Sequence, residues 1–267
     1  MRMKLQVLAS LLFLSSLPGC SERTDASEPR KHVDSSGGTV ALGLGSAGAY
    51  RPTTLSASGS FGGTISLQGA SGDSAVAVTR DSPVCGDSAN VTETQVSGTS
   101  LANVLVWVDG VASGKSLSGV RRVTLVIENC RFVPRLIAVS TGTTINVLSR
   151  DRVAHTSRFY RENSGEPIEV ISTVDAGQVV PSEKIASQPG IVEARHTQHS
   201  WARGYIAVFD HPYHAVTDAR GGFTIDSLPP GTYTFKVWHE GMAGPAEQRA
   251  VVAPGGVGRL ELALTLK

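Results

Sequence analysis

The stretch Leu260-Glu261-Leu262-Ala263-Leu264-Thr265-Leu266, close to the C-terminus, places a leucine at every second position. Because successive side chains of a strand point to opposite faces, this alternation puts all four leucines on one face of a β-strand. A strand of this kind buries its apolar face against a second sheet. The stretch therefore predicts a β-sandwich or barrel at this end of the chain.

Shorter stretches upstream have the same character. Val104–Val108 and Val123–Ile127 are rich in β-branched residues, and turn sequences such as Asp109-Gly110 and Pro229-Pro230-Gly231 separate such stretches. No helical pattern is longer than two turns. Short strands over about two hundred residues predict an all-β chain with two sandwiches or barrels, divided near His211. Further strands are expected at residues 64–67, 75–78, 136–139, 143–148, 205–209, 222–225 and 233–238.

The composition excludes several function classes. Across 267 residues, 24 Lys and Arg balance 23 Asp and Glu, so the net charge is +1, and aromatic residues make up only 6%. A nucleic-acid-binding protein with a basic surface and stacking aromatics is therefore not expected. The chain has no Gly-x-Ser-x-Gly, no phosphate-binding loop and no His-Glu-x-x-His, so no common enzyme class is indicated.

The N-terminus has the pattern of an export signal. Two basic residues, Arg2 and Lys4, precede the mostly apolar stretch 5–14, which is too short to span a bilayer comfortably. Leu17-Pro18-Gly19-Cys20 then resembles the bacterial lipobox, which implies removal of residues 1–19 and acylation of Cys20. Ser21 after the cysteine favours the outer membrane. We therefore expect a lipoprotein of the bacterial cell envelope, anchored to a membrane and facing the periplasm.

Residues 20–62 read as a flexible tether. They contain Ser35-Ser36-Gly37-Gly38 and similar runs, with few large apolar side chains to bury, so they cannot offset the entropy of ordering. His32 is expected to be solvated there. The folded part is expected to divide into residues 63–210 and residues 211–267.

Two cysteines remain besides Cys20. In an oxidising compartment, Cys85 and Cys130 favour a disulfide, which closes a loop of about 45 residues and stabilises the fold by roughly 3–4 kcal/mol. The alternative is a pair of thiolate metal ligands, for which a nearby Cys-x-x-Cys motif is absent.

Several motifs together resemble exported bacterial plastocyanin-like (cupredoxin) proteins, also called methylamine utilisation proteins, that carry a C-terminal carboxypeptidase-regulatory-like domain. The resemblance extends from about Gly63 to the end. The matching stretches are Val84-Cys85-Gly86, 101–106, Cys130-Arg131-Phe132-Val133-Pro134, Gly142-Thr143, Asp151 with His155, His199-Ser200-Trp201, 211–218, 222–225, 228–233 and Trp238-His239-Glu240. The resemblance implies a cupredoxin-like Greek-key sandwich followed by a smaller, prealbumin-like β-sandwich.

The resemblance also implies a copper site, from which this sequence departs. The early and late histidine ligands match His155 and His199, whereas the cysteine position holds His196 and the methionine position holds Ala202. Without a thiolate, a blue-copper centre is excluded. Either the three histidines bind copper or zinc through imidazole alone, or the site has lapsed.

Six arginines and a group of C-terminal residues remain to be placed. The arginines either crowd the rim of the site and favour an acidic partner, or form a solvated surface balanced by carboxylates; they are Arg135, Arg150, Arg152, Arg158, Arg195 and Arg203. A second group is expected to hydrogen-bond across the domain junction, with a second metal site at its histidines as the alternative; it comprises His211, Tyr213, His214, Trp238 and His239.

The sequence thus favours a non-enzymatic envelope lipoprotein that binds a metal or a protein partner. Two alternatives stay open. One is a purely structural or adhesive β-sandwich protein without metal, and the other is a copper enzyme with three histidine ligands.

Overall fold

The computed structural model describes residues 42–45, 48–69, 75–91, 94–117, 119 and 122–266. All of these residues belong to one compact unit. The expected signal peptide, Cys20, His32 and tether residues 20–41 lie outside the described part. The described residues are almost entirely β-structure, which confirms the all-β class. None of their helices is long and apolar enough to cross a membrane.

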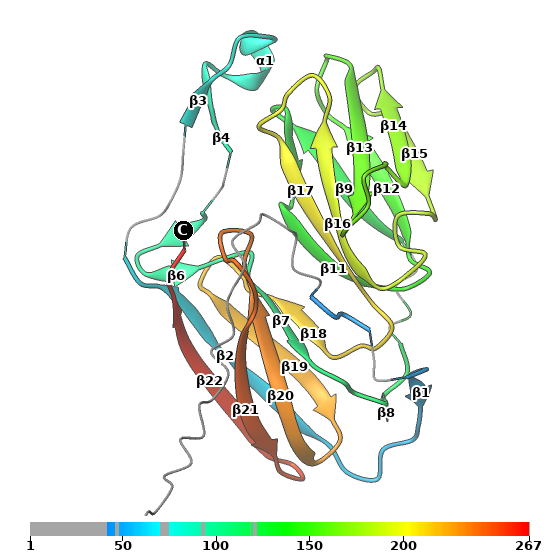
Figure 1. Cartoon of the computed structure of the whole chain (residues 1–267), viewed down its shortest axis with the longest axis vertical. Coiled ribbons are helices and arrows are strands. Elements are labelled where there is room, and N and C mark those ends of the chain that lie inside the picture. Colours follow the sequence, from blue (N-terminus) through cyan, green and yellow to red (C-terminus); the bar gives the residue numbers. More distant parts are fainter. Residues whose placement is uncertain are drawn as a thin grey trace, which may run out of the picture. The chain divides into compact units, whose positions relative to one another are not determined.

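The first sandwich is built from nine strands (Figure 1). They are β9 (Arg122–Glu128), β10 (Arg131–Val133), β11 (Leu136–Ser140), β12 (Thr144–Ser149), β13 (His155–Arg161), β14 (Glu169–Thr173), β15 (Val179–Ser182), β16 (Gly190–His196) and β17 (Arg203–Phe209). One sheet has the order β10–β9–β12–β15 and the other the order β11–β17–β16–β13–β14. The chain changes sheet between β10 and β11.

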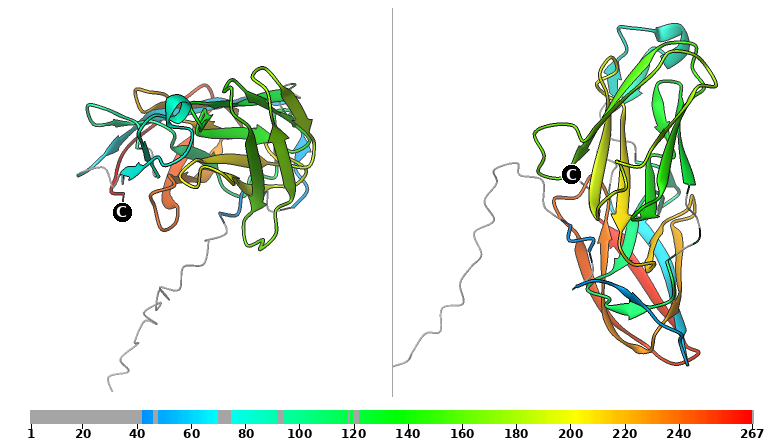
Figure 2. Two further views of the ribbon diagram at one scale, coloured as in Figure 1. Left: turned by 90° about the horizontal axis from the view of Figure 1, so that it is seen from above. Right: turned by 90° about the vertical axis from the view of Figure 1, so that its right-hand side faces the viewer.

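Alternating burial explains how these two sheets pack. Along β12, Ile145 and Val147 point inward between more exposed neighbours, and they meet Phe159 and Ile206 of the opposite sheet in one apolar core. Figure 2 shows the two sheets lying face to face. The pairs β9–β12 and β11–β17 are parallel, whereas the other pairs are antiparallel, so the topology is a Greek key rather than a meander. This is the predicted cupredoxin-like sandwich.

The second sandwich also has nine strands. They are β2 (Gly59–Leu67), β5 (Val96–Ser97), β6 (Ser100–Leu101), β7 (Leu105–Val108), β18 (His214–Val216), β19 (Gly222–Leu228), β20 (Gly231–Trp238), β21 (Ala246–Val252) and β22 (Val257–Leu264). One sheet has the order β18–β7–β20–β21; the other has the order β19–β2–β6–β5, with β22 paired to β2. Its core includes Phe61 and Phe235, whose stacked rings are 3.6 Å apart.

The strand pairing corrects the linear division at residues 210 and 211. β7 lies between β18 and β20, and β2 lies between β19 and β22, so residues 211–267 do not form the second sandwich alone. The cupredoxin-like sandwich is inserted between β7 and β18, which are neighbours in one sheet, with His214 opposite Trp107. The sequence pattern could not show this, because alternation reveals strands but not their partners.

The expected tether is also corrected for its described part. Leu42 and Leu44 are buried, 3% and 2% exposed, and β2 begins at Gly59, inside residues 20–62. The glycines of β2 serve close packing rather than flexibility, because a Cβ at Gly63 would collide with the backbone of Leu260. A short pair of strands, β1 (Arg51–Pro52) and β8 (Ser113–Gly114), further holds this region.

A small excursion lies outside both sandwiches (Figure 1). It consists of β3 (Ala75–Ala77), the single helical turn α1 (Ser82–Cys85) and β4 (Ser88–Asn90). Cys85 forms a disulfide with Cys130, which lies in the turn between β9 and β10. An apolar cluster that includes Val78, Ala89 and Trp201 surrounds this disulfide.

The two sandwiches share a buried junction. Trp107 and Trp238 of the second sandwich belong to the same apolar cluster as Leu136 and Phe209 of the first. A bidentate ion pair crosses it: Arg135 donates from Nε and Nη2 to the two carboxylate oxygens of Glu240, at 2.5 and 2.8 Å. Both side chains are less than a tenth exposed.

Candidate metal centre

The three histidines singled out by the sequence meet at one end of the cupredoxin-like sandwich. His155 begins β13 and His196 ends β16, and the two strands are antiparallel neighbours with Ser157 opposite His196. His199 follows three residues later, in the turn that leads to β17. Because the start of one strand and the end of its antiparallel neighbour lie at the same end of the sheet, the fold brings the three rings together.

The rings are close to one another and almost fully buried. The ring centroids of His155 and His196 are 4.7 Å apart, and those of His155 and His199 are 5.2 Å apart. The three residues are 1%, 3% and 0% exposed. One ring nitrogen of each lies within 4.8 Å of the corresponding nitrogens of the other two. This spacing suits three ligands that converge on one ion.

Asp151 fixes the orientation of the His155 ring. Its carboxylate is 2.9 Å from His155 Nε2, and a carboxylate accepts hydrogen bonds, so Nε2 carries the proton. The same carboxylate accepts the backbone N–H groups of Asn129 and Cys130, both at 2.8 Å. These two residues have positive φ, 51° and 60°, so Asp151 also holds an unusual turn in place.

Asp81 plays the corresponding role for His199. Its carboxylate accepts a hydrogen bond from His199 Nε2 at 3.0 Å, across 118 residues of sequence. Asp81 immediately precedes α1, so the excursion reaches the histidine cluster. Cys85 Sγ also lies 3.6 Å from His199 Nε2. The excursion therefore covers the centre and contributes one of its orienting groups.

At least one ring nitrogen of each histidine is buried and has no hydrogen-bond partner among the described residues. These atoms are Nδ1 of His155, Nδ1 of His199 and both ring nitrogens of His196. A buried polar atom without a hydrogen bond is destabilising, and metal-ligating histidines commonly donate their other ring N–H to a carboxylate. The residues present therefore fit a metal ion, and Asp151 and Asp81 accept hydrogen bonds from two of its three ligands.

The electrostatics keep the imidazoles of His155 and His196 neutral. Burial lowers the pKa of His196 well below the ordinary value of 6.5, and the neighbouring His155 and His199 lower it further. Burial also lowers the pKa of His155, against the opposing effect of Asp151. A neutral imidazole keeps the lone pair that a metal requires.

The rest of the lining is apolar. The ring of Phe132 lies 4.3 Å from that of His196, and the ring of Trp201 lies 5.1 Å from that of His199. Ala202 is 2% exposed and packs in the apolar cluster around the disulfide. Its methyl group offers no donor atom where a methionine thioether would. The arrangement can hold an ion on imidazole nitrogen alone.

The arginines lie beside carboxylates rather than in one cationic rim. Arg135 is buried in the ion pair with Glu240. Glu193 pairs with both Arg195 and Arg203, and Glu128 pairs with Arg150. Arg152 and Arg158 are exposed. Arg150, Arg195 and Arg203 thus fit the expected surface of arginines balanced by carboxylates, whereas Arg135 is buried at the junction.

The five junction residues are divided between two environments. His214 stacks on Phe209 at 4.3 Å and Trp238 meets Tyr205 edge-on at 5.6 Å, so both contact the first sandwich. Tyr213 lies in the core of the second sandwich, where its backbone N–H donates to His211 Nδ1. His239 is buried and accepts from the N–H of Gly241. Within the described ranges, these histidines do not form a cluster of converging ligand atoms.

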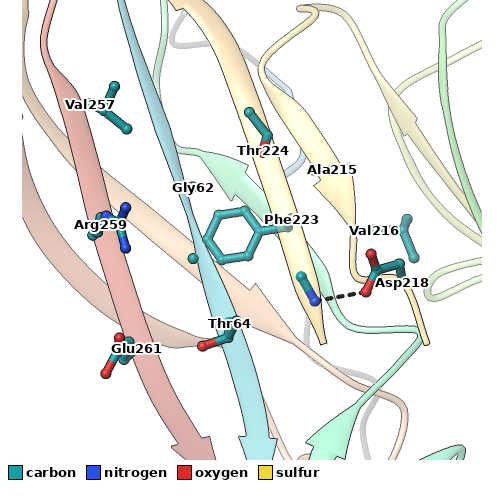
Figure 3. A pocket seen from close by; sticks show the side chains of 12 residues that line it. Gly62, Thr64, Ala215, Val216, Asp218, Phe223, Thr224, Val257, Arg259 and Glu261 are labelled. Atoms are coloured by element: carbon teal, nitrogen blue, oxygen red, sulfur yellow. Dashed lines mark hydrogen bonds between the residues drawn. The ribbon is translucent and has the colours of Figure 1, made fainter. Parts of the chain in front are cut away.

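An open hollow of about 620 Å³ lies on the second sandwich (Figure 3). Phe223 and Thr224 of β19, Gly62 of β2 and Arg259 of β22 line it. Asp218 beside it accepts the backbone N–H of Gly222. None of the histidines of the first sandwich lines this hollow, so it is separate from the candidate metal centre.

Comparison with known proteins identifies the second sandwich. Residues 192–265 match the family model of the carboxypeptidase regulatory-like domain, a stretch that begins within β16 and β17 of the first sandwich and continues through β18 to β22. The chain therefore contains such a domain, and the strands β2 and β7 that complete its sheets lie upstream of the matched residues. None of the curated proteins matches the chain.

About a third of the chain is similar to solved structures of copper proteins. A Cu-containing nitrite reductase (NirK) from Thermus scotoductus is 20% identical, with a TM-score of 0.30 over 36% of this chain and 24% of the reductase. A purple cupredoxin from Nitrosopumilus maritimus is 18% identical, with a TM-score of 0.27 over 32% of this chain and 97% of its own. An amicyanin mutant with Cu(I) is 19% identical, with a TM-score of 0.28 over 33% and 81%. The assignment of the site rests on the geometry of the histidines and not on these likenesses.

The sequence did not reveal Asp81 or Asp151 as orienting groups. Asp151 precedes His155 by four residues, which is a visible signal, since a loop of that length allows a side chain to turn back to the ring. Asp81 has no such signal, because only the path of the excursion brings it to His199.

Proposed function

We propose that this chain is a non-enzymatic lipoprotein of the bacterial cell envelope whose cupredoxin-like sandwich binds one metal ion through His155, His196 and His199. The ion is copper or zinc, because imidazole suits both, and divalent copper binds most tightly in a site of this kind. The observation that carries the proposal is the meeting of three buried imidazoles, each with a ring nitrogen that has no hydrogen-bond partner in the described part of the chain.

The ligand set favours holding an ion over fast electron exchange. A bound copper ion would supply one-electron chemistry, but neither a thiolate nor a thioether is present at His196 and Ala202 to tune it. Phe132 and Trp201 exclude water from the rings, and the excursion covers them. These residues shield the ligands, and Asp151 and Asp81 orient two of them. We therefore propose metal retention without turnover.

The location is proposed from the N-terminal sequence. Acylation of Cys20 would anchor the chain to a membrane, and export would place it in the compartment where the disulfide between Cys85 and Cys130 persists. The regulatory-like sandwich, joined to the metal-binding one through the Arg135–Glu240 pair, would then serve contact with a protein partner in the envelope.

The test is metal binding by the full chain, purified in detergent, stripped with a chelator and titrated with Cu(II) or Zn(II) against a competing chelator. We expect one ion per chain and no intense visible thiolate band. The affinity should fall more than about 100-fold in His155→Ala and His196→Ala, because loss of a ligand lowers metal affinity more than loss of a group that only orients a ligand. His211→Asn, which changes a buried histidine outside the cluster, should leave affinity unchanged. Equal binding by all four proteins, or none, would overturn the proposal and favour a structural or adhesive protein.

A further inference from the structure

The disulfide lies beside His199, near the ring nitrogen that also contacts Asp81. Cys85 Sγ is 3.6 Å from His199 Nε2, whereas Nδ1 of the same ring has no hydrogen-bond partner among the described residues. The two sulfurs and a His199 nitrogen all lie within 4.8 Å of one another. Cys85, Cys130 and His199 are 5%, 0% and 0% exposed. Three strong donors of soft metals are therefore already gathered in one buried place.

We propose that reduction of this disulfide creates a second metal site, formed by Cys85, Cys130 and His199, that takes monovalent copper. A dithiol supplies two electrons and two protons: its own sulfurs become a disulfide, the Cys85–Cys130 bond breaks, and each cysteine gains one hydrogen. When Cu(I) binds, the two thiols release their protons to solvent, and each thiolate donates an electron pair to the ion. The Nε2 proton of His199 moves to Nδ1, so that Nε2 supplies the third electron pair in place of its hydrogen bond to Asp81, and His199 then serves this site instead of the three-histidine centre. The copper is not oxidised or reduced in this step.

The donor set selects the metal. Thiolate ligands favour soft ions such as Cu(I), whereas structural zinc sites use four ligands and this group offers three. The reducing conditions that open the disulfide also keep copper monovalent. The site goes beyond the proposed three-histidine centre, because it uses the two sulfurs and Nε2 of His199.

The surroundings keep the sulfurs near each other after the bond is broken. Cys85 and Cys130 pack in one apolar cluster with Val78, Ala89 and Trp201, and this packing does not depend on the S–S bond. Asp151 also holds the backbone of Cys130 in its turn. The excursion is thus retained over the centre by contacts that survive reduction.

The experiment compares the oxidised full chain with the chain reduced by a dithiol and freed of it without oxygen. Each is titrated with Cu(I) against a Cu(I)-specific chelator, while free thiols are counted. We expect reduction to raise Cu(I) affinity at least tenfold, with both thiols protected from labelling once copper is bound. His155→Ala should retain this gain, although it breaks the three-histidine centre, so the two proposals fail separately.

The controls are Cys85→Ser with Cys130→Ser, and His199→Gln. The first removes both sulfurs, and the second keeps the cysteines and the disulfide, so it remains informative if the serine variant folds poorly. Both should lose the gain in Cu(I) affinity. Equal Cu(I) affinity of the oxidised and reduced chains, or thiols that stay fully reactive with copper bound, would overturn the inference.

Discussion

Replacement of Asp151 tests how far the protein preorganises its metal ligands. The carboxylate is 5% exposed and accepts three hydrogen bonds: Oδ1 from Asn129 N–H, and Oδ2 from Cys130 N–H and His155 Nε2–H. An asparagine has one acceptor oxygen. If that oxygen takes the place of Oδ2, His155 keeps its partner and only the N–H of Asn129 is left unpaired.

The magnitudes follow from this count. Asp151→Asn leaves the partly buried N–H of Asn129 without its acceptor, which lowers the free energy of unfolding by about 1 kcal/mol. Because His155 retains a weaker partner, metal affinity should fall by about tenfold, at the low end of the range for outer partners. Asp151→Ala removes all three acceptor interactions, so its affinity should fall by about 100-fold. The assay is competitive titration with Zn(II), beside urea unfolding of the metal-free proteins.

Asp81 offers the matched comparison. Its side chain is 32% exposed and its carboxylate orients His199. Asp81→Asn should therefore lower metal affinity by about tenfold with little change in unfolding free energy. If Asp151→Ala and Asp81→Asn both bind Zn(II) as tightly as the unmodified chain, the carboxylates do not orient ligands and the reasoning is refuted.

Three further predictions concern the fold. Glu240→Ala leaves Arg135 buried without its carboxylate and should lower the free energy of unfolding by about 3–5 kcal/mol. The double variant Arg135→Met with Glu240→Leu should change this free energy little. Urea unfolding measures both, and an unchanged free energy of unfolding in Glu240→Ala would contradict the buried pair. Trp107→Ala should cost about 3–5 kcal/mol by opening a cavity at the junction, measured the same way, and a loss below 1 kcal/mol would contradict its packing. Burial lowers the pKa of His211 to about 4 and that of His214 to about 3, so the unfolded chain binds protons that the native chain does not, and stability falls as the pH drops below about 6.5. Between pH 6.5 and 5, each of these two histidines should contribute about 2 kcal/mol to the loss of stability. His211→Asn should remove the contribution of His211. If the variant shows the same dependence of unfolding free energy on pH as the unmodified chain, His211 does not have the lowered pKa.

Sequence patterns located the strands well and their partners poorly. Alternation at Val123–Ile127 and at Leu260–Leu266 is a local property, and strands were found at both places. That β7 pairs with both β18 and β20 is a non-local property, which depends on the path of more than a hundred residues between them. Composition misled at Leu42 and Gly59, because small residues that suit a tether also suit a tightly packed strand.

The histidine cluster likewise depends on one local and one non-local feature of the chain. His196 and His199 are three residues apart, so their proximity needs only a turn, and His155 joins them because β13 and β16 are neighbours. The resemblance to cupredoxins supplied that neighbour relation in advance. Asp81 could not be found in this way, because the excursion that carries it lies outside both sandwiches and is fixed by a disulfide to Cys130.

The most direct test of the metal centre is a crystal structure of the copper-loaded chain with anomalous scattering measured at the copper edge. We predict one strong anomalous peak within bonding distance of His155 Nδ1, His199 Nδ1 and a ring nitrogen of His196, with Asp151 and Asp81 still bound to the opposite nitrogens. No peak at the three rings, or copper bound only at other residues, would contradict the account.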